Sequence, residues 1–430
     1  MSEVWLRKNR RRRLEMGHPW VYKSEIADVK GEPKRAEVVV VKNHQGHYLA
    51  TGFYHPDSQI AVRIATYDDK EVIDKGWLKR RVTAAFAYRK RFLPRVDFCR
   101  AIYGEADGLP GLIVDKYGSI AVVQVLSAAM EARRTWIAPV LKDILGVNSV
   151  YERSDAPTRL MEGLEPSEGC LLGECPKEVE VMENGLKFWV DIVSGQKTGH
   201  FFDQRENRAA IAPIVRFSAA EKPRPDLRYE EPPGDLDRRE NIHKMAKTNG
   251  NRHGATVLDC FCHTGGFAMH ALLYGASHVT LVDSSEHAIV TAKQNAEANN
   301  FSDRCEFVVA NAFDQLRTYE QEGRTFDVVI LDPPAFAKTK GAVEGALRGY
   351  KEINLRGLKL VAEGGFLVTA SCSYHVSPDV WKEVIADAAQ DARKILRLVE
   401  YRSAAKDHPQ LFSMPENDYL KFAIFMVQSR

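Results

Sequence analysis

Residues 256–267 read Thr-Val-Leu-Asp-Cys-Phe-Cys-His-Thr-Gly-Gly-Phe. A short apolar run ends near Asp259 and is followed at once by the paired glycines Gly265 and Gly266. Paired glycines let the backbone approach a ligand closely, and the helix that they begin favours anionic groups at its N-terminus. This stretch therefore predicts a strand, a ligand-binding turn and a helix in that order.

The same alternation continues toward the C-terminus. Apolar strands are predicted at 256–261, 278–283, 306–310, 327–332 and 365–370, and helices at 265–273, 286–299 and 342–362. Strands that alternate with amphipathic helices predict an α/β fold with a parallel, doubly wound sheet. Two last strands, 395–401 and 419–427, have no helix between them, so we expect an antiparallel pair at the end of the sheet.

Ligands of doubly wound sheets bind beyond the carboxyl ends of the strands. Asp259 ends the first strand and Asp283 ends the second, 24 residues later (259 to 283), a spacing suited to a carboxylate that grips ribose hydroxyls. The dinucleotide fingerprint G-x-G-x-x-G is missing. Asp259 would repel a pyrophosphate but could hold an ammonium, which favours S-adenosylmethionine. The alternative is an ordinary tight turn, with Asp283 as a helix cap.

The next three strand ends also carry polar or reactive side chains. Asn311 could contact adenine, and Phe313 could cover its ring. Residues 332–336 read Asp-Pro-Pro-Ala-Phe, a rigid loop that suits a planar substrate base. Cys372 lies between two serines after the fifth strand, where the alternative to a reactive thiol is a buried small hydrophobe.

The rest of the chain predicts further modules. Residues 1–75 alternate short β-rich runs (36–42, 48–52 and 60–65) with turns, and residues 76–185 read as a small α+β domain with helices near 73–92 and 131–144. Residues 218–254 are charged and proline-rich, which predicts an inserted mobile loop.

Composition excludes several classes of protein. With 430 residues, 44% hydrophobic and 27% charged, the chain has the make-up of a globular protein of two or three domains. No run is long enough for a membrane span and no signal peptide is evident, so we expect a cytoplasmic protein. Seven cysteines are interpreted as free thiols, and Cys170 with Cys175 lacks zinc-site partners, so no metal is expected.

Two local clusters of positive charge stand out against a net charge of only +2. Residues 7–13 read Arg-Lys-Asn-Arg-Arg-Arg-Arg, and residues 79–100 hold eight basic side chains against Asp97 alone. Such clusters can neutralise phosphates, although each could also be a solvated face. Together they favour binding to RNA or DNA.

These motifs resemble class I S-adenosylmethionine-dependent RNA methyltransferases, most closely the RlmI-like large-subunit rRNA cytosine methyltransferases. Residues 184–205, which include Ser194-Gly195-Gln196-Lys197-Thr198-Gly199-His200-Phe201-Phe202-Asp203-Gln204-Arg205, are similar to the family's signature before its first motif. Residues 259–267, 332–336, 371–373 and 407–409 (Asp-His-Pro) follow in the family's order.

The resemblance implies an RNA-binding PUA domain at 1–74, a central α+β domain at 75–185 and a Rossmann-like methyltransferase domain at 186–430. It implies S-adenosylmethionine as cofactor, large-subunit (23S) rRNA as partner, no membrane, and a second copy of the chain as a candidate partner. The expected cofactor contacts are Lys197, Thr198, Phe201, Asp203, Arg205, Asp259, Phe261, Thr264, Gly265, Gly266, Asp283, Asn311, Ala312 and Asp332.

The expected reaction is methylation of cytosine at carbon 5, for which Cys372 is the predicted nucleophile and Asp332 a second catalytic residue. A thiolate that attacks carbon 6 would activate carbon 5, and its pKa must fall or its proton be removed on substrate binding. One alternative is methylation of an exocyclic amine of adenine or guanine at residues 332–336. Another is a noncatalytic RNA-binding factor for ribosome assembly.

Overall fold

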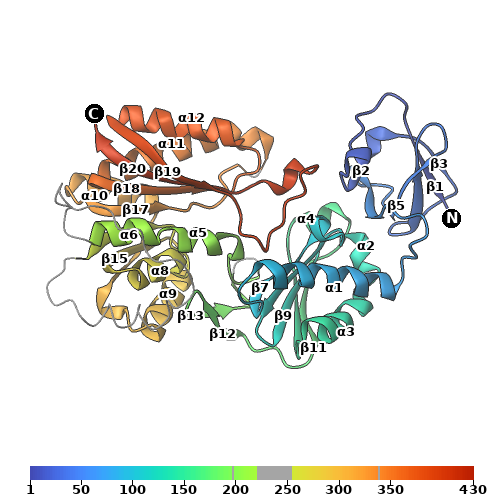
Figure 1. Cartoon of the computed structure of the whole chain (residues 1–430), viewed down its shortest axis with the longest axis horizontal. Helices are drawn as coiled ribbons and strands as arrows, with labels where there is room; N and C mark the ends of the chain where they lie inside the picture. The colour runs from blue at the N-terminus through green and yellow to red at the C-terminus, as the bar shows by residue number, and fades with distance from the viewer. Residues whose placement is uncertain (196–197, 220–253, 338) are drawn as a thin grey trace. The chain divides into compact units, whose positions relative to one another are not determined.

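The structure, a computed structural model, describes residues 1–195, 198–219, 254–337 and 339–430. It divides into two compact units (Figure 1). The first unit contains residues 1–182, 189–203 and 405–418, and the second contains residues 183–188, 204–404 and 419–430. The predicted insert at 218–254 lies almost wholly outside the described residues, and so does Lys197.

The first unit begins with a six-stranded sheet in the order β2-β6-β5-β4-β1-β3. Its elements are β1 Glu3–Leu6, η1 Leu14–Met16, β2 Trp20–Tyr22, η2 Lys23–Glu25, β3 Ile26–Lys30, β4 Val38–Lys42, β5 Tyr48–Tyr54 and β6 Ile60–Thr66. Alternate residues of β4 are buried, among them Val39 and Val41 in the core of this sheet. The β-rich module predicted from residues 1–75 is confirmed.

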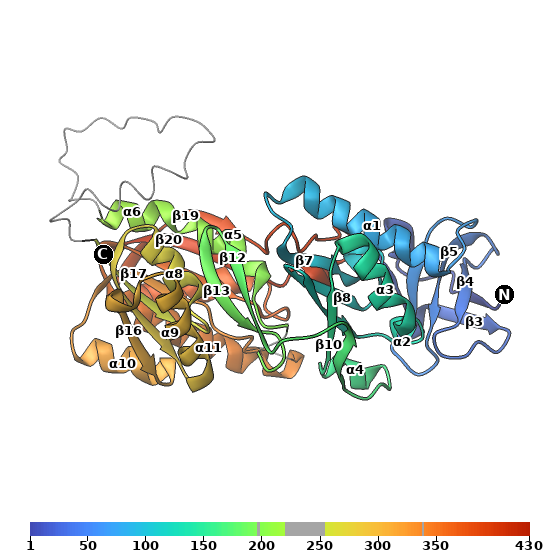
Figure 2. The same ribbon diagram turned by 90° about the horizontal axis from the view of Figure 1, so that it is seen from below.

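A five-stranded sheet in the order β11-β10-β9-β8-β7 follows. Its elements are α1 Lys75–Phe92, β7 Phe98–Tyr103, η3 Gly104–Asp107, β8 Leu112–Tyr117, β9 Ile120–Val125, α2 Ala128–Glu131, α3 Arg134–Leu145, β10 Ser149–Ser154, α4 Thr158–Met161 and β11 Ser167–Leu172. Helix α1 begins where Asp74 accepts a hydrogen bond from the Trp77 N–H at 2.8 Å. Helices α1 and α3 share one apolar core with the sheet (Figure 2).

The basic cluster of residues 79–100 is only partly a surface feature, because five of its cations are exposed, one is half-buried and two are buried. Five of its eight cations form ion pairs, and Arg89 and Arg100 are buried. The pairs are Lys79–Asp143, Arg80–Glu71, Arg81–Glu71, Arg89–Asp107 and Arg100–Asp115. Their carboxylates lie elsewhere in the chain and reach the cluster only when the unit folds.

Arg100 also joins the motif of residues 407–409 to the interior of the first unit. Its N–H donates to Asp407 at 3.1 Å, and its guanidinium lies 3.0 Å from His408 Nε2. His408 is buried and lies beside the Tyr103 ring, with 5.0 Å between ring centroids. These contacts give His408 a structural role in the first unit.

Two cysteines differ from the predicted free thiols. Cys170 and Cys175 form a disulfide, with their Cα atoms 6.0 Å apart. The end of β11 and the turn after it bring these atoms within the usual range for a bridge. Five cysteines are free, among them Cys260, Cys262 and Cys372.

The second unit is built on a seven-stranded sheet in the order β16-β15-β14-β17-β18-β20-β19. Its strands are β14 Ala255–Cys260, β15 Ala276–Asp283, β16 Cys305–Val309, β17 Phe326–Leu331, β18 Val361–Ser371, β19 Lys394–Arg402 and β20 Lys421–Ser429. The first five pair in parallel, while β20 pairs antiparallel with β18 and β19. The predicted parallel sheet and its antiparallel end are both confirmed.

Helices cover both faces of this sheet (Figure 1). They are α5 Arg205–Ala210, α6 Ala212–Ala219, α8 Gly266–Leu273, α9 Glu286–Ala298, α10 Ala312–Gln321, α11 Val343–Leu360 and α12 Pro378–Asp391. Strands β12 Glu178–Glu183 and β13 Leu186–Asp191 form a separate two-stranded sheet. Across the described ranges, no helix is both long and apolar enough to span a membrane.

The chain order in the large sheet reverses at β14. Strands β15 and β16 extend the sheet on one side of β14, whereas β17 and β18 extend it on the other. The carboxyl ends of β14 and β17 therefore form a topological switch point, the position at which doubly wound sheets bind ligands.

Candidate active site

The carboxyl edge of the large sheet collects most of the residues that the sequence singled out. Asp259 lies near the end of β14 and Asp283 ends β15. Asn311 follows β16, Asp332 follows β17 and Cys372 follows β18. Because all five strands are parallel, these residues stand at one edge of one sheet.

The loop after β14 has an unusual backbone. Phe261, His263 and Gly265 have φ angles of 63°, 49° and 81°, all in the left-handed region. A Cβ at Gly265 would lie 3.2 Å from the Leu281 side chain, so glycine meets both a conformational and a steric need there. Left-handed non-glycine residues cost energy and cluster at ligand sites.

Side chains hold this loop in place. Asp283 accepts a hydrogen bond from the His263 N–H at 2.9 Å, and Asn295 donates to the Thr264 carbonyl at 2.9 Å. Gly266 begins helix α8, and a Cβ there would lie 3.0 Å from the Arg208 side chain. Side-chain hydrogen bonds thus fix the conformation of this loop, which distinguishes it from an ordinary tight turn.

The environment of Asp259 perturbs its carboxylate. It is fully buried, and its Oδ2 accepts a hydrogen bond from the Ala268 N–H at 3.0 Å. Its Oδ1 has no hydrogen-bond partner among the residues that the structure describes. Burial raises the pKa of Asp259 well above its usual value, and the nearby charges of Asp332 and Asp283 raise it further.

A cationic ligand fits this arrangement. Three carboxylates gather at Asp259, Asp283 and Asp332, and a buried acceptor atom of one of them is unused within the described chain. The ammonium of an amino acid would supply both the hydrogen bond and the missing positive charge. The donor set therefore fits the amino acid end of S-adenosylmethionine.

Asp283 and Asn311 also serve the local fold. Asp283 accepts a second hydrogen bond from the Ser285 N–H at 2.9 Å, just before α9. Asn311 is the N-cap of α10, because its Oδ1 accepts from the Phe313 N–H at 2.9 Å. Asp283 remains half-buried, Asn311 is exposed, and the Asn311 amide can still donate to a ring nitrogen.

Three aromatic side chains, two from the loops after β14 and β17 and one from the first turn of α10, meet beside these polar groups. The Phe313 ring lies 5.8 Å from that of Phe336 and 6.4 Å from that of Phe261, centroid to centroid. Phe336 in turn lies 4.7 Å from Tyr350 of α11. Together they form an apolar wall suited to planar rings.

Asp332 directly precedes the proline pair, and Cys372 lies beside the first of these two prolines. Gln204 donates to Asp332 Oδ1 at 2.9 Å, and Cys372 Sγ lies 3.7 Å from the Pro333 carbonyl oxygen. Cys372 is half-buried. By contrast, Cys260 and Cys262 are buried, and burial raises their thiol pKa well above the usual value, as expected of packing residues.

Sequence reasoning missed three residues that support the loop of Cys372, namely Ala337, Tyr350 and Lys421. Ser373 Oγ accepts from the Ala337 N–H at 3.1 Å and lies 2.9 Å from the Tyr350 hydroxyl. This links the loops after β17 and β18. Lys421 of β20 is 1% exposed and donates to the Ser373 carbonyl at 2.7 Å. No sequence motif marks Lys421, since β20 reaches β18 only in the folded sheet.

The residues predicted upstream of β14 are divided between the units. Thr198, Phe201 and Asp203 belong to the first unit, where Thr198 is buried, its hydroxyl donates to Asp115, and its carbonyl accepts from the Tyr117 hydroxyl at 2.8 Å. Arg205 begins α5 in the second unit and lies 3.5 Å from Glu183. Their predicted cofactor contacts stay predictions.

Comparison with known proteins agrees with this fold. Residues 4–67 match the family described as PUA-like domain, and residues 234–372 match the family described as Conserved hypothetical protein 95. The chain is 38% identical to "Ribosomal RNA large subunit methyltransferase I" of Pseudoalteromonas translucida, over 99% of each chain. It is 37% identical to the protein of the same name from Klebsiella pneumoniae, over 97% of this chain and 96% of the relative.

Two solved chains, both named as putative methyltransferases, share the fold. One, from Streptococcus mutans, aligns with a TM-score of 0.77 at 18% identity, over 99% of this chain and 100% of its own. The other, complexed with SAH, aligns with a TM-score of 0.78 at 19% identity over the same shares.

The doubly wound sheet and these likenesses define an S-adenosylmethionine-dependent methyltransferase. Identity of 37–38% over nearly the full length shows the family as well. The chain belongs to the family of ribosomal RNA large subunit methyltransferase I.

Proposed function

We propose that this protein methylates carbon 5 of a cytosine in large-subunit rRNA, with Cys372 as covalent nucleophile. The names of the relatives supply the substrate class. The observation that carries the rest is the position of Cys372, half-buried beside the Pro333 carbonyl. It directly follows β18, the strand that pairs with β17, which ends before Asp332.

Carbon 5 of cytosine is a poor nucleophile and needs activation. The Cys372 thiolate forms a bond to carbon 6, and the electron pair of the 5,6 double bond moves toward carbon 5. S-adenosylmethionine, when bound, supplies an electrophilic methyl group. Removal of the carbon 5 proton by a base then restores the double bond, and the carbon 6–sulfur bond breaks to release Cys372 as thiolate.

Asp332 and the aromatic wall hold the base for this reaction. Asp332 accepts a hydrogen bond from the cytosine amino group, while its other interaction, with Gln204, fixes its orientation. Phe336 lies four residues further along and offers a stacking surface. The cytosine must leave its own stack to reach Cys372.

The rival reaction is methylation of an exocyclic amine, which the Asp-Pro-Pro-Ala-Phe loop could also support. The two are separated by measuring methylated nucleosides in large-subunit rRNA by mass spectrometry after reaction with the Cys372→Ala protein. Cysteine catalysis predicts 5-methylcytidine with the unchanged protein and none with Cys372→Ala. Cys305→Ala is the matched control, because this half-buried cysteine begins β16 at the opposite edge of the sheet.

A noncatalytic assembly factor would retain the fold without using the cofactor. Isothermal titration with S-adenosylmethionine tests this alternative. Saturable binding that is lost in Asp259→Ala supports the enzyme, whereas absence of binding to the unchanged protein favours the assembly factor.

A further inference from the structure

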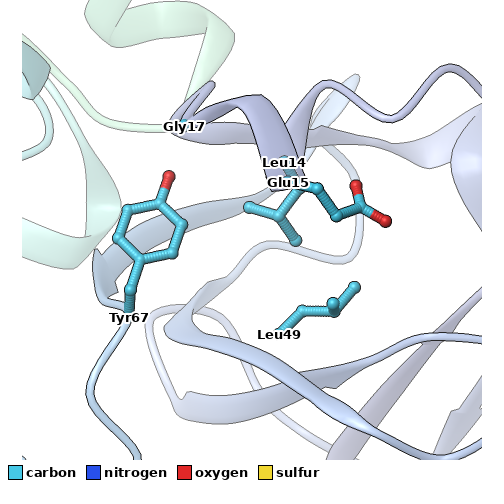
Figure 3. A pocket seen from close by; sticks show the side chains of 5 residues that line it. All are labelled: Leu14, Glu15, Gly17, Leu49 and Tyr67. Atoms are coloured by element: carbon cyan, nitrogen blue, oxygen red, sulfur yellow. The ribbon is translucent and has the colours of Figure 1, made fainter.

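The six-stranded sheet of the first unit carries a cavity of its own. It has a volume of about 360 Å³ and is lined by Leu14, Glu15, Gly17, Leu49 and Tyr67 (Figure 3). Leu14 and Glu15 belong to η1, Leu49 belongs to β5, and Tyr67 directly follows β6. Its residues are separate from those at the carboxyl edge of the large sheet.

The cavity has the form of a slot between an aromatic ring and aliphatic side chains. In Figure 3 the Tyr67 ring stands on one side, and the side chains of Leu14 and Leu49 stand across the space from it. Tyr67 is 48% exposed, although its hydroxyl donates to the His18 carbonyl at 3.3 Å. This hydrogen bond orients the ring, and partial burial raises the pKa of Tyr67 to about 12.

Gly17 shapes the wall between these side chains. Its φ is 88°, and it ends η1 by donating its N–H to the Leu14 carbonyl. The left-handed turn returns the chain toward His18, whose carbonyl holds the Tyr67 hydroxyl. The slot is therefore part of the folded sheet rather than a gap between loose side chains.

Strong positive charge borders one side of this slot. Residues 7–13 carry six basic side chains, of which Arg7, Lys8, Arg11 and Arg12 are exposed. Arg10 pairs with Glu15 of the lining at 2.6 Å. Although burial raises the pKa of Glu15, Arg10 and Arg12 lower it below the usual value, so Glu15 is an ionised acceptor.

The opposite side carries the other sign of charge. Asp68 and Asp69, both exposed, follow Tyr67 directly. A phosphate chain would be repelled there and attracted by the arginines that precede Leu14. A bound polyanion should therefore place its phosphates toward these arginines and away from Asp68 and Asp69.

We propose that this slot binds one unpaired nucleobase of the RNA substrate, stacked between Tyr67 and the pair Leu14 and Leu49. The flanking phosphates lie toward Arg11 and Arg12, and Glu15 accepts a hydrogen bond from an exocyclic amine of the base. Bases that leave a duplex are bound in this way, between aromatic and apolar side chains. The inference rests on the proposed function only in taking RNA as the substrate.

An apolar peptide would be the other occupant with matching chemistry. It would contact Leu14, Leu49 and Tyr67 but would gain nothing from the six cations beside them. The charge of the segment and the aromatic ring of Tyr67 therefore favour the nucleobase.

The test uses the full chain and a fluorescein-labelled, 12-nucleotide single-stranded RNA of mixed sequence at fixed ionic strength. Tyr67→Ala should bind this probe about 10-fold more weakly, because base stacking on an aromatic ring is lost. Tyr67→Phe should bind as the unchanged protein does. Tyr401→Ala, at a half-exposed tyrosine of β19 in the second unit, is the matched control and should also leave binding unchanged.

A fully paired duplex of the same length should not distinguish Tyr67→Ala from the unchanged protein. Irradiation of a probe that contains 5-iodouridine, followed by mass spectrometry of the cross-linked peptides, gives a second readout that needs no substitution. We expect cross-links to the peptide that contains Tyr67.

The proposal that the slot binds a nucleobase would be overturned if Tyr67→Ala and the unchanged protein bound the RNA probe equally. It would also be overturned if the cross-links were confined to other peptides. Tighter binding of an apolar peptide than of the RNA would assign the cavity to a protein partner and also overturn it. Cys372→Ala separates this proposal from the cysteine mechanism. It should lose methylation but keep the Tyr67-dependent binding, so either proposal can fail alone.

Discussion

Lys421 Nζ lies 2.7 Å from the carbonyl oxygen of Ser373, the residue after Cys372. The same ammonium donates to the carbonyls of Val376 at 3.0 Å and Tyr419 at 2.9 Å. A buried lysine that binds three carbonyls holds the loop after β18 against the adjacent strand. The position of Cys372 thus depends on a residue 49 positions away in the sequence (372 to 421).

Lys421→Met should place Cys372 incorrectly while leaving the cofactor loop after β14 intact. Three carbonyls, two of them buried, would lose a donor, which should lower the free energy of unfolding by about 2–4 kcal/mol. Methyl transfer should slow by about 10-fold or more, because small misplacements of reacting groups are costly. Affinity for S-adenosylmethionine, measured by titration calorimetry, should stay within about twofold.

The control for this variant is Lys382→Met, at an exposed lysine of α12. Lys382→Met should change neither the free energy of unfolding nor the rate of methyl transfer. Equal losses of cofactor affinity and rate in Lys421→Met would instead mean that the whole sheet edge had been disturbed, and the positioning role would be refuted.

Asp259→Asn should act in opposite directions on cofactor affinity and on stability. Loss of the charge should weaken binding of S-adenosylmethionine by about 10-fold or more, since hydrogen bonds to charged groups contribute about 1.5–3 kcal/mol. Without ligand, removal of a carboxylate that is buried near Asp283 and Asp332 should raise the melting temperature at alkaline pH.

The pH dependence follows from the raised pKa of Asp259. The folded protein binds this proton at pH values where the unfolded chain has released it, so stability falls as pH rises from the unfolded pKa, near 3.8, to the raised folded pKa. Asp259→Asn should remove this part of the decline. If unfolding curves of the two proteins differ by the same amount at every pH, the assignment to Asp259 is wrong.

Gly265→Ala should destabilise the second unit by more than the cost of placing an alanine in the left-handed conformation. A left-handed alanine costs about 1–2 kcal/mol, and its Cβ would also press on Leu281. Gly323→Ala is the matched control, because Gly323 has a φ of 67° and open space around its Cβ position. Chemical denaturation should show the larger loss for Gly265→Ala, and only that variant should weaken cofactor binding.

Much of the second unit could be predicted from its sequence. Strand β14 was expected at 256–261 and spans 255–260, and β17 was expected at 327–332 and spans 326–331. The signals were local, since each apolar run ends at a polar residue or a glycine turn. Helix α12 was not predicted, although Ser377 and Pro378 begin it as an N-cap and first-turn proline.

The interactions that could not be predicted join distant parts of the chain. Lys421 reaches Ser373 because β20 inserts beside β18, where Lys421 pairs with Ser371. Nothing near residue 421 reveals that partner. The basic cluster at 79–100 shows the same limit, because its carboxylate partners, such as Asp107 and Asp115, become neighbours only in the folded sheet.

Arg89 illustrates how a cation in a basic cluster can be structural. It is fully buried, pairs with Asp107 at 2.5 Å and donates to the Asp407 carbonyl at 2.8 Å. Arg89→Met should lower the free energy of unfolding by about 3–5 kcal/mol. Arg95→Met, at an exposed position of the same cluster, should stay within about 0.5 kcal/mol. A stable Arg89→Met protein with weakened RNA binding would contradict the structural role.

The most direct measurement of the cysteine mechanism uses large-subunit rRNA in which 5-fluorocytidine replaces cytidine. Fluorine at carbon 5 leaves no proton for the base to remove, so the bond between Cys372 and carbon 6 cannot break after methyl transfer. We predict a protein–RNA adduct that survives denaturation, requires S-adenosylmethionine, and maps by mass spectrometry to the peptide that contains Cys372. Adduct formation that persists in Cys372→Ala, or methylation of the fluorinated RNA without any adduct, would contradict the mechanism.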